Sequence, residues 1–210
     1  GFLRAALSYL RGSNIDLVTM DEAFRRLDEK DFARRFAAFT LDDGYRDNRD
    51  HALPLFREFD VPCTVYVASD FAEGTGRLWW IELERALAKA DTIEVEIGSE
   101  MVRLETKTAL QKQAAFDRLH DWLRALPGEY DVLREVAALC VRHGVDAHAI
   151  CPELCMSWDE LRAFASDPLV TIGAHTITHP NLAKQREDAA LNELKTSRER
   201  IETQLGRPVR

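Results

Sequence analysis

Three short, almost continuously hydrophobic segments are the clearest structural signal in the sequence. They are residues 36–41 (FAAFTL), 63–68 (CTVYVA) and 169–174 (LVTIGA). Apolar runs of this length, without alternating polar positions, are typical of strands that are buried on both faces of a parallel sheet. Residues 46–59, between the first two segments, have a helical pattern. The sequence of strand, helix and strand predicts a βαβ unit, and therefore an α/β fold.

Capping residues indicate where further helices begin. Thr19-x-x-Glu22 and Ser157-x-x-Glu160 are capping boxes, each in front of an apolar pattern. A long helical pattern also follows Pro180 and ends before Gly206. We expect the apolar positions of these helices to pack against the sheet: Ala23, Phe24, Leu27, Leu191, Leu194, Ile201 and Leu205.

The middle of the chain has a different pattern. Hydrophobic and charged residues alternate over 93–97 and again over 102–104, on either side of Gly98-Ser99, which predicts a β-hairpin. Helical patterns follow over 107–126 and 129–143. We therefore predict an α/β core made of residues 1–73 and 157–210, with residues 74–156 as an inserted hairpin-plus-helices segment that forms a lid or an interface, including one between copies of the chain.

Several side chains in and near this segment have two readings. Trp79-Trp80 could stack on sugar rings, but anchoring of the segment by burial is the favoured interpretation. Arg77, Glu82 and Glu84 are expected to be solvated charges.

Composition and charge narrow the function classes. The chain has 210 residues, 46% of them hydrophobic, with 28 basic and 36 acidic residues and a net charge of −8. This composition is globular, and the acidic balance disfavours a nucleic-acid partner. No apolar run approaches the ~18 residues that a membrane span requires. No signal peptide is visible, which favours a cytoplasmic location, although the sequence begins with Gly1 rather than Met.

The four cysteines are expected to be buried thiols. Cys151 and Cys155 have a C-x3-C spacing without a matching second pair, so a structural zinc site on them is disfavoured.

Two of the three predicted strands end in residues that can carry chemistry. The first is followed by Asp42-Asp43-Gly44-Tyr45, and adjacent carboxylates at a buried strand end are costly unless a cation or a proton is shared. Taken alone, this sequence also fits an ordinary solvated turn. The third strand is followed by His175-x3-His179, and Pro180 favours a rigid loop over a helix there. Taken alone, the two histidines also fit a structural role.

Taken together, the two aspartates and two histidines are a more specific signal for a metal centre than either motif alone. One carboxylate and two imidazoles provide three ligands of a catalytic metal centre with open positions, and the second carboxylate remains as a base. This set indicates hydrolysis.

The segments TLDDGY and GAHTITHP resemble the first two motifs of the NodB-type polysaccharide deacetylases, in which Phe is usual at the position of Leu41. The resemblance implies a distorted (β/α) barrel, here partial, and a metal-dependent hydrolase that removes acetyl groups from N- or O-acetylated glycans with metal-activated water. It implies that Asp43, His175 and His179 bind a divalent metal ion, with zinc as the favoured ion. It further implies that Asp42 is the catalytic base and that the backbone N–H of Tyr45 stabilises the oxyanion. Thr176 would steady the histidine loop.

The later motifs of the family, including the general acid, do not follow Arg210, so the sequence is interpreted as a fragment that lacks them and that could be inactive by itself. Two alternatives stay open: a hydrolase of the same fold that acts on another non-peptide C–N bond, and a non-catalytic glycan-binding protein. The sequence does not identify the glycan.

Overall fold

The computed structural model describes residues 1–209 and has the mixed α/β fold that the sequence predicts. Its central sheet has three parallel strands in the order β3 (Phe39–Leu41), β4 (Cys63–Val67) and β7 (Val170–Ala174). Leu41 is paired with Val65, and Val65 with Ile172. Because the strands are parallel and in this register, their carboxyl ends lie at the same edge of the sheet.

The first predicted strand is not one continuous element. Residues 36–41 are divided at Ala38 between β2 (Arg35–Ala37), which pairs with β1 (Ile15–Leu17), and β3, which pairs with β4. The segment is also half-buried to exposed rather than buried on both faces. The hydrophobic pattern identified an extended segment, but it carries no information about the change of partner strand.

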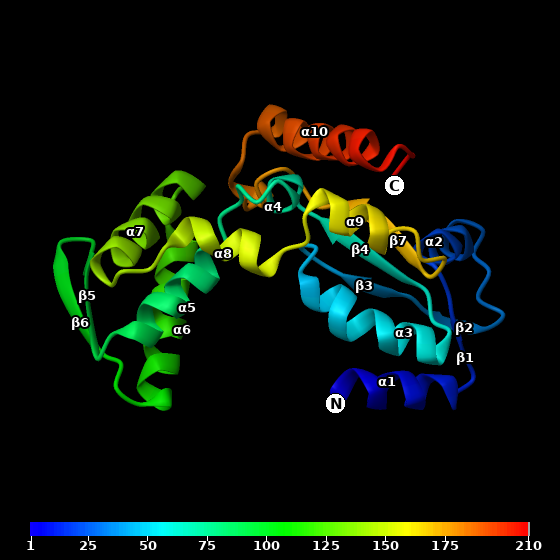
Figure 1. Cartoon of the computed structure of the whole chain (residues 1–210), viewed down its shortest axis with the longest axis horizontal. Coiled ribbons are helices and arrows are strands. Elements are labelled where there is room, and N and C mark those ends of the chain that lie inside the picture. The colour runs from blue at the N-terminus through cyan, green and yellow to red at the C-terminus, as the bar shows by residue number, and fades with distance from the viewer. Residues whose placement is uncertain (210) are drawn as a thin grey trace. The chain divides into compact units, whose positions relative to one another are not determined.

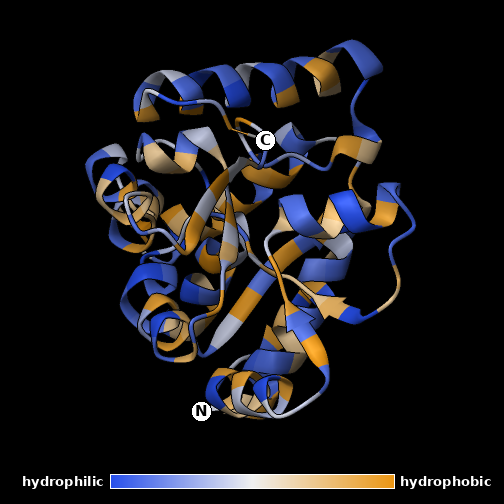
Figure 2. Ribbon diagram, turned by 90° about the vertical axis from the view of Figure 1, so that its right-hand side faces the viewer, coloured by the Kyte–Doolittle hydropathy of each residue, from blue (hydrophilic) through white to orange (hydrophobic). Residues whose placement is uncertain are grey.

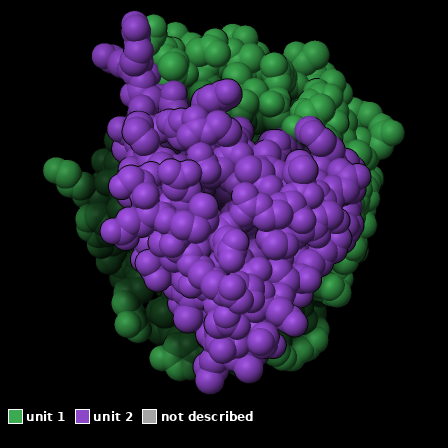
Figure 3. All heavy atoms as spheres, turned by 90° about the vertical axis from the view of Figure 1, so that its left-hand side faces the viewer, with its two compact units in different colours: residues 1–75, 154–179, 188–210 green, residues 76–153, 180–187 purple. Residues whose placement is uncertain are grey.

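The chain forms two compact units, coloured separately in Figure 3. Unit 1 consists of residues 1–75, 154–179 and 188–210, and unit 2 consists of residues 76–153 and 180–187. The lid or interface role expected for the middle segment stays a prediction.

Unit 1 surrounds its strands with helices. In Figure 1, α3 and α10 lie on opposite sides of the strands, and α1 packs against α3. A single turn of π-helix precedes α3, and Pro54 occupies the first turn of α3. The helices of this unit are α1 (Phe2–Arg11), α2 (Met20–Asp28), η1 (Asn48–Ala52), α3 (Leu53–Phe59), α4 (Ser69–Ala72), α9 (Trp158–Phe164) and α10 (Glu187–Leu205).

The core of unit 1 joins the strands to these helices. Its fully buried members include Phe56, Val65, Leu161 and Ile201. Trp158, at the start of α9, is buried in the same core.

Two helices bury less apolar surface than their patterns predict. In α2, Ala23 is buried but Phe24 and Leu27 are 70% and 58% exposed. The Thr19 cap is present, whereas the Glu22 carboxylate accepts hydrogen bonds from Arg25 and Arg26 rather than from the cap.

The long C-terminal helix begins at Glu187, after a short 3₁₀ turn η2 (Leu182–Lys184), and it is largely hydrophilic in Figure 2. Leu191 and Leu194 are 45% and 44% exposed, because Ser197 and Ile201 form the buried face of the helix. The predicted packing therefore holds for the second half of α10 only.

Unit 2 contains the predicted hairpin and helices. In the hairpin Val95 is paired with Val102, and Gly98 adopts φ 67° in the turn. Its core is formed by residues such as Leu83, Ile93, Leu119 and Val136. The elements are α5 (Trp79–Lys89), β5 (Thr92–Ile97), β6 (Glu100–Glu105), α6 (Ala109–Ala125), α7 (Glu129–Arg142) and α8 (Ala147–Leu154).

Helix α5 was not predicted, and its residues correct one expectation. Glu82 is fully buried, and its carboxylate accepts a hydrogen bond from Nε of Arg77 at 2.7 Å, so it is not a solvated charge. Glu84 is exposed, as expected. Trp79 packs partly against the core of unit 2 and stacks on His120 at 5.3 Å between ring centroids.

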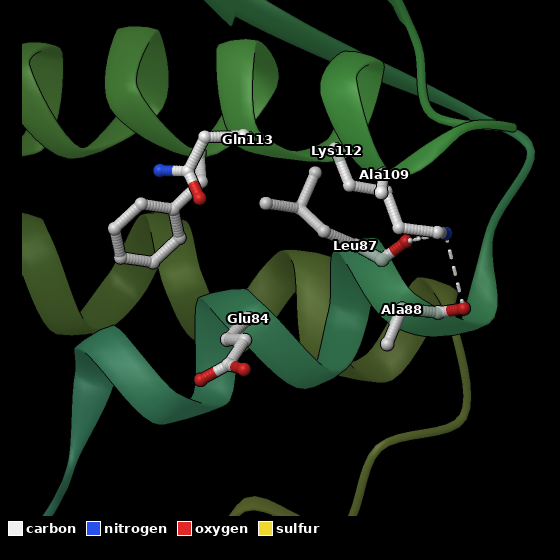
Figure 4. A pocket seen from close by; sticks show the side chains of 7 residues that line it. Glu84, Leu87, Ala88, Ala109, Lys112 and Gln113 are labelled. Atoms are coloured by element: carbon white, nitrogen blue, oxygen red, sulfur yellow. Dashed lines mark hydrogen bonds between the residues drawn. The ribbon is translucent and has the colours of Figure 1, made fainter.

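The end of α5 is capped by a lysine from α6. Lys112 Nζ donates to the carbonyl oxygens of Leu87 and Ala88 at 2.6 and 3.2 Å (Figure 4), and to that of Ala90 at 3.2 Å. These are carbonyl groups that the helix leaves without an intrahelical partner. A groove of about 440 Å³ lies beside this cap.

The four cysteines are buried and form no disulfide among residues 1–209, which confirms the prediction of buried thiols. Among residues 1–209, no helix combines the length and the apolar character that crossing a bilayer would need.

Candidate metal centre

The predicted site residues lie at the carboxyl ends of the central strands. Asp42 and Asp43 follow β3, and His175 follows β7. The end of β4 lies between them in the sheet, and its Val67 carbonyl accepts the backbone N–H of His175 at 2.9 Å. The parallel topology therefore places two motifs that are far apart in the sequence at one edge of the sheet.

The aspartate turn has an unusual backbone. Asp43 and Gly44 have φ values of 68° and 71°, and the Gly44 N–H donates to the Asp42 carbonyl at 2.9 Å. A Cβ atom at Gly44 would lie 3.2 Å from Cγ2 of Val67. Glycine is thus required both for the left-handed conformation and for close contact with β4.

The histidine loop is equally irregular. Thr176 and His179 have φ values of 70° and 62°, so the segment is a loop and not a helix, as Pro180 predicts. The His179 N–H donates to the Thr176 hydroxyl at 3.1 Å. Non-glycine residues in this conformation are uncommon and occur mainly where function requires them.

Three side chains from these two segments converge. Asp43 Oδ1 lies 3.3 Å from Nε2 of His179 and 3.8 Å from Nε2 of His175. One ligand atom from each residue lies within 4.8 Å of the others, and no second such group of three occurs among residues 1–209. The Asp43 side chain is 13% exposed, while the imidazoles of His175 and His179 are 35% and 31% exposed. The cluster is therefore closed on the aspartate side and open on the histidine side.

Burial dominates the electrostatics of the cluster. It raises the pKa of Asp43, an effect that the two histidines oppose and Asp42 reinforces. Burial also lowers the pKa of His179, which keeps the imidazole neutral and able to act as a ligand.

The donor set fits a metal ion. Asp43 Oδ1 is buried and accepts no hydrogen bond from residues 1–209. A buried anionic oxygen without a donor is costly unless a cation lies beside it. One carboxylate oxygen and two imidazole nitrogens form a ligand set of catalytic zinc sites, which keep further positions open.

The other two predicted residues flank this cluster. Asp42 is exposed, beside Asp43. Tyr45 is half-buried and forms an isolated antiparallel bridge with Cys155. The neighbouring Gly44 carbonyl accepts the N–H of Met156 at 3.0 Å, so the aspartate turn is fastened to the segment in front of α9.

Sequence reasoning missed the charges that support the aspartate motif. Glu160 accepts hydrogen bonds from Arg46 at 2.9 Å and from Arg49 at 2.7 Å. Its carboxylate also accepts the Ser157 N–H, which confirms the predicted capping box. The side chain of Arg46 lowers the pKa of Glu160 by hydrogen bonding. The capping box was the available signal, but nothing in the sequence indicated that Glu160 also bound these arginines.

Aromatic contacts on the histidines were also not predicted. Phe71 stacks on His179 at 5.7 Å, and Tyr66 lies 6.4 Å from His175 between ring centroids. Both rings come from β4 or the short helix that follows it.

The similarity to one solved structure, which has a TM-score of 0.50, shows the fold. BA0330 from Bacillus anthracis is 15% identical with a TM-score of 0.50 and aligns over 99% of this chain and 40% of its own. The deacetylase PplD of Streptococcus pyogenes, solved with acetate, is 15% identical with a TM-score of 0.48, over 99% of this chain and 58% of its own. The BpsB deacetylase domain of Bordetella bronchiseptica is 16% identical with a TM-score of 0.48, over 99% and 66%.

The chain thus spans 58% and 66% of the lengths of two of these deacetylase structures. A search of curated proteins found no significant match. The family model described as polysaccharide deacetylase matches residues 29–210, which include both the aspartate and the histidine motif. The chain belongs to the polysaccharide deacetylase family.

Proposed function

We propose that this protein is a metal-dependent hydrolase that removes acetyl groups from N- or O-acetylated polysaccharides or oligosaccharides. The family membership supports the reaction class. The observation that carries the proposal is the convergence of Asp43 Oδ1 with Nε2 of His175 and His179, at an oxygen that accepts no hydrogen bond from residues 1–209.

Asp43, His175 and His179 would hold a divalent cation, with zinc as the ion that the donor set favours. When bound, such a cation supplies Lewis acidity, which polarises a carbonyl group and acidifies water. The hydrogen bonds within and around both motifs would hold the three side chains near one another before the ion arrives. The exposed edges of the two imidazoles leave room for a substrate on that side.

Asp42 would act as the general base. Its side chain is exposed beside the cluster, so it can take a proton from the attacking water. The water oxygen forms a bond to the acetyl carbon, and the bond between that carbon and the nitrogen or oxygen of the sugar breaks. The water gives up one proton to Asp42, and the departing amine or hydroxyl takes up one proton, so the overall proton count is unchanged. The backbone N–H of Tyr45 would stabilise the negative charge on the tetrahedral carbon's oxygen.

We further propose that the strands of unit 1 are part of a distorted (β/α) barrel and that the middle segment is an insertion into it. The parallel order β3–β4–β7 and the active residues at the strand ends support the barrel. The separate core of unit 2 supports an insertion that selects substrates or joins copies of the chain.

The test is acetate release from a panel of N- and O-acetylated oligosaccharides, with zinc supplied. The test uses the protein in its full natural length, because the sequence predicts that the general acid lies in later motifs, and the wild-type protein is expected to release acetate. Asp42→Asn should bind zinc normally but lose at least about a hundredfold in rate, because general base catalysis typically contributes that much. Asp43→Asn should lose both zinc and activity. Zinc-loaded protein that releases no acetate from any member of the panel, or that is unaffected by Asp42→Asn, would contradict the proposal.

A further inference from the structure

An acidic side chain that the proposed chemistry does not use contacts the histidine loop. Glu193 lies on α10, and its Oε2 accepts the backbone N–H groups of Ile177 and Thr178 at 2.7 and 3.0 Å. Its Oε1 accepts the Thr178 hydroxyl at 3.0 Å. One carboxylate therefore binds two of the three residues that separate His175 from His179 (the spacing H-x3-H).

The conformation of this loop needs support from outside. The residues on either side of the Glu193 contact, Thr176 and His179, both have left-handed φ values. Such residues persist only where the surrounding structure holds them. Two consecutive N–H groups that donate to one carboxylate form charge-assisted hydrogen bonds, which are stronger than neutral ones.

The backbone carbonyl groups of the loop accept hydrogen bonds from backbone N–H groups. The N–H groups of Ser69 and Asp70, at the start of α4, donate to the carbonyl oxygens of Thr176 and Ile177 at 3.1 and 3.0 Å. These bonds do not depend on side-chain identity. Apart from the Thr176 hydroxyl within the loop, Glu193 is a side chain whose substitution can release the loop without changing either histidine.

The same helix is tied to α4 by an ion pair. Arg200 Nη1 lies 2.8 Å from Asp70 Oδ1, about two turns along α10 from Glu193. Helix α10 thus contacts both the histidine loop and the short helix that binds its carbonyl groups. Glu193 therefore lies on a helix that is itself attached to α4.

We propose that Glu193 is a positioning residue for the metal centre: it holds the histidine loop in the conformation in which His175 and His179 face Asp43. The inference rests on the proposed role of these three residues as a cation site. Glu193 does not act on the substrate. Its contribution is to the affinity for the ion, since a loop that is already in the binding conformation loses less entropy on binding.

The test measures zinc affinity by calorimetry with a competing chelator, and hydrogen exchange of the loop amides. Glu193→Ala should weaken zinc binding by about tenfold, the lower end of the loss seen when partners that orient metal ligands are removed. It should also speed exchange at Ile177 and Thr178. Glu193→Gln should stay within about threefold of wild type, because its amide oxygen can accept both N–H groups and its NH2 can donate to the Thr178 hydroxyl.

Glu199→Ala is the matched control. Glu199 lies on the same helix and is exposed, so its removal should change neither measurement. If Glu193→Ala fails to fold by circular dichroism, Glu193→Asp carries the test, because it keeps the charge but is one methylene shorter and should bind zinc more weakly than Glu193→Gln.

The outcomes separate this inference from the proposed function. Wild-type zinc affinity in a folded Glu193→Ala or Glu193→Asp variant, even with a lower melting temperature, would show a structural role only and overturn the inference. A wild-type chain that binds no zinc would contradict the metal site itself, and the inference with it.

Discussion

Each of the two units buries an acidic side chain, and these two side chains have contrasting environments. In unit 2, Glu82 is fully buried and forms an ion pair with Arg77. In unit 1, Asp43 is 13% exposed, and its Oδ1 accepts no hydrogen bond from the described residues. The first carboxylate is neutralised within the chain, whereas the second has only two imidazoles beside it. A buried charge that the chain itself leaves without compensation indicates a cation-binding site more directly than burial alone.

Backbone conformation follows the same division. Left-handed non-glycine residues are Lys30, Asp43, Asp60, Thr176 and His179. All five belong to unit 1, and three of them belong to the two motifs. In unit 2, the left-handed residues among the described ones are the glycines Gly98 and Gly144, which adopt this conformation without a steric cost. The unfavourable conformations thus gather where the ligand atoms converge.

Neutralising the two buried carboxylates should affect the free energy of unfolding differently. Glu82→Gln leaves Arg77 without its charged partner and should lower the free energy of unfolding by about 2 kcal/mol, less than for a wholly buried pair because Arg77 is partly exposed. Asp43→Asn should leave it unchanged or higher, because burial raises the pKa of Asp43 and so disfavours its charged form. Urea denaturation of the metal-free proteins at neutral pH measures both, and equal destabilisation would remove the distinction.

Two glycines allow the same comparison for the backbone. Gly44→Ala should cost about 2 kcal/mol, because it adds a Cβ 3.2 Å from Val67 to a residue with positive φ. Gly98→Ala has a similar φ but open space around the new atom, and should cost about 1 kcal/mol. Thermal unfolding of both variants gives the difference. Only Gly44→Ala should also weaken zinc binding, and an equal loss in Gly98→Ala would argue against a local effect.

A change confined to unit 2 should affect stability alone. Lys112→Met keeps the aliphatic stem but removes the ammonium that caps the last carbonyl groups of α5. The expected loss is about 1 kcal/mol, the usual contribution of a charge at a helix C-terminus. Zinc calorimetry on the same variant should match wild type, and a changed affinity would show that the capping lysine influences the metal centre.

The buried thiols predict a weak alkaline instability. Burial raises the pKa of Cys63 in unit 1 to about 12 and that of Cys140 in unit 2 to about 11, from 9.0 in the unfolded chain. A raised folded-state pKa gives stability that is complete below pH 9 and is lost as the pH rises toward the folded value. Between about pH 8 and pH 9.5 each thiol should lower the free energy of unfolding by less than about 1 kcal/mol. Cys63→Ala and Cys140→Ala should each reduce this dependence, and an unchanged pH profile would contradict it.

Much of the fold and the convergence of the candidate site residues could be predicted because the signals were local. The strands Cys63–Val67 and Val170–Ala174, the hairpin turn at Gly98 and the Ser157 cap each follow from a few neighbouring residues. The motif residues converge because parallel strands end at one edge.

What the sequence did not reveal depends on how side chains outside a helix are placed against it. Glu82 resembles a surface residue until Arg77 is placed beside it, and Glu193 resembles any polar helix position until the histidine loop lies against it. Leu191 and Leu194 have the spacing of a buried face, but the turn of α10 that packs is the one with Ser197 and Ile201. Hydrophobic periodicity identifies a helix but does not fix which part of it is covered.

The most direct test of the central claim, that the uncompensated carboxylate of unit 1 belongs to a metal centre, is a zinc titration by calorimetry on three proteins. The account predicts one ion per wild-type chain, loss of binding in Asp43→Asn, and unchanged binding in Glu82→Gln, although the latter is the less stable variant. Binding that survives in Asp43→Asn, or a wild-type chain that takes up no zinc, would contradict it.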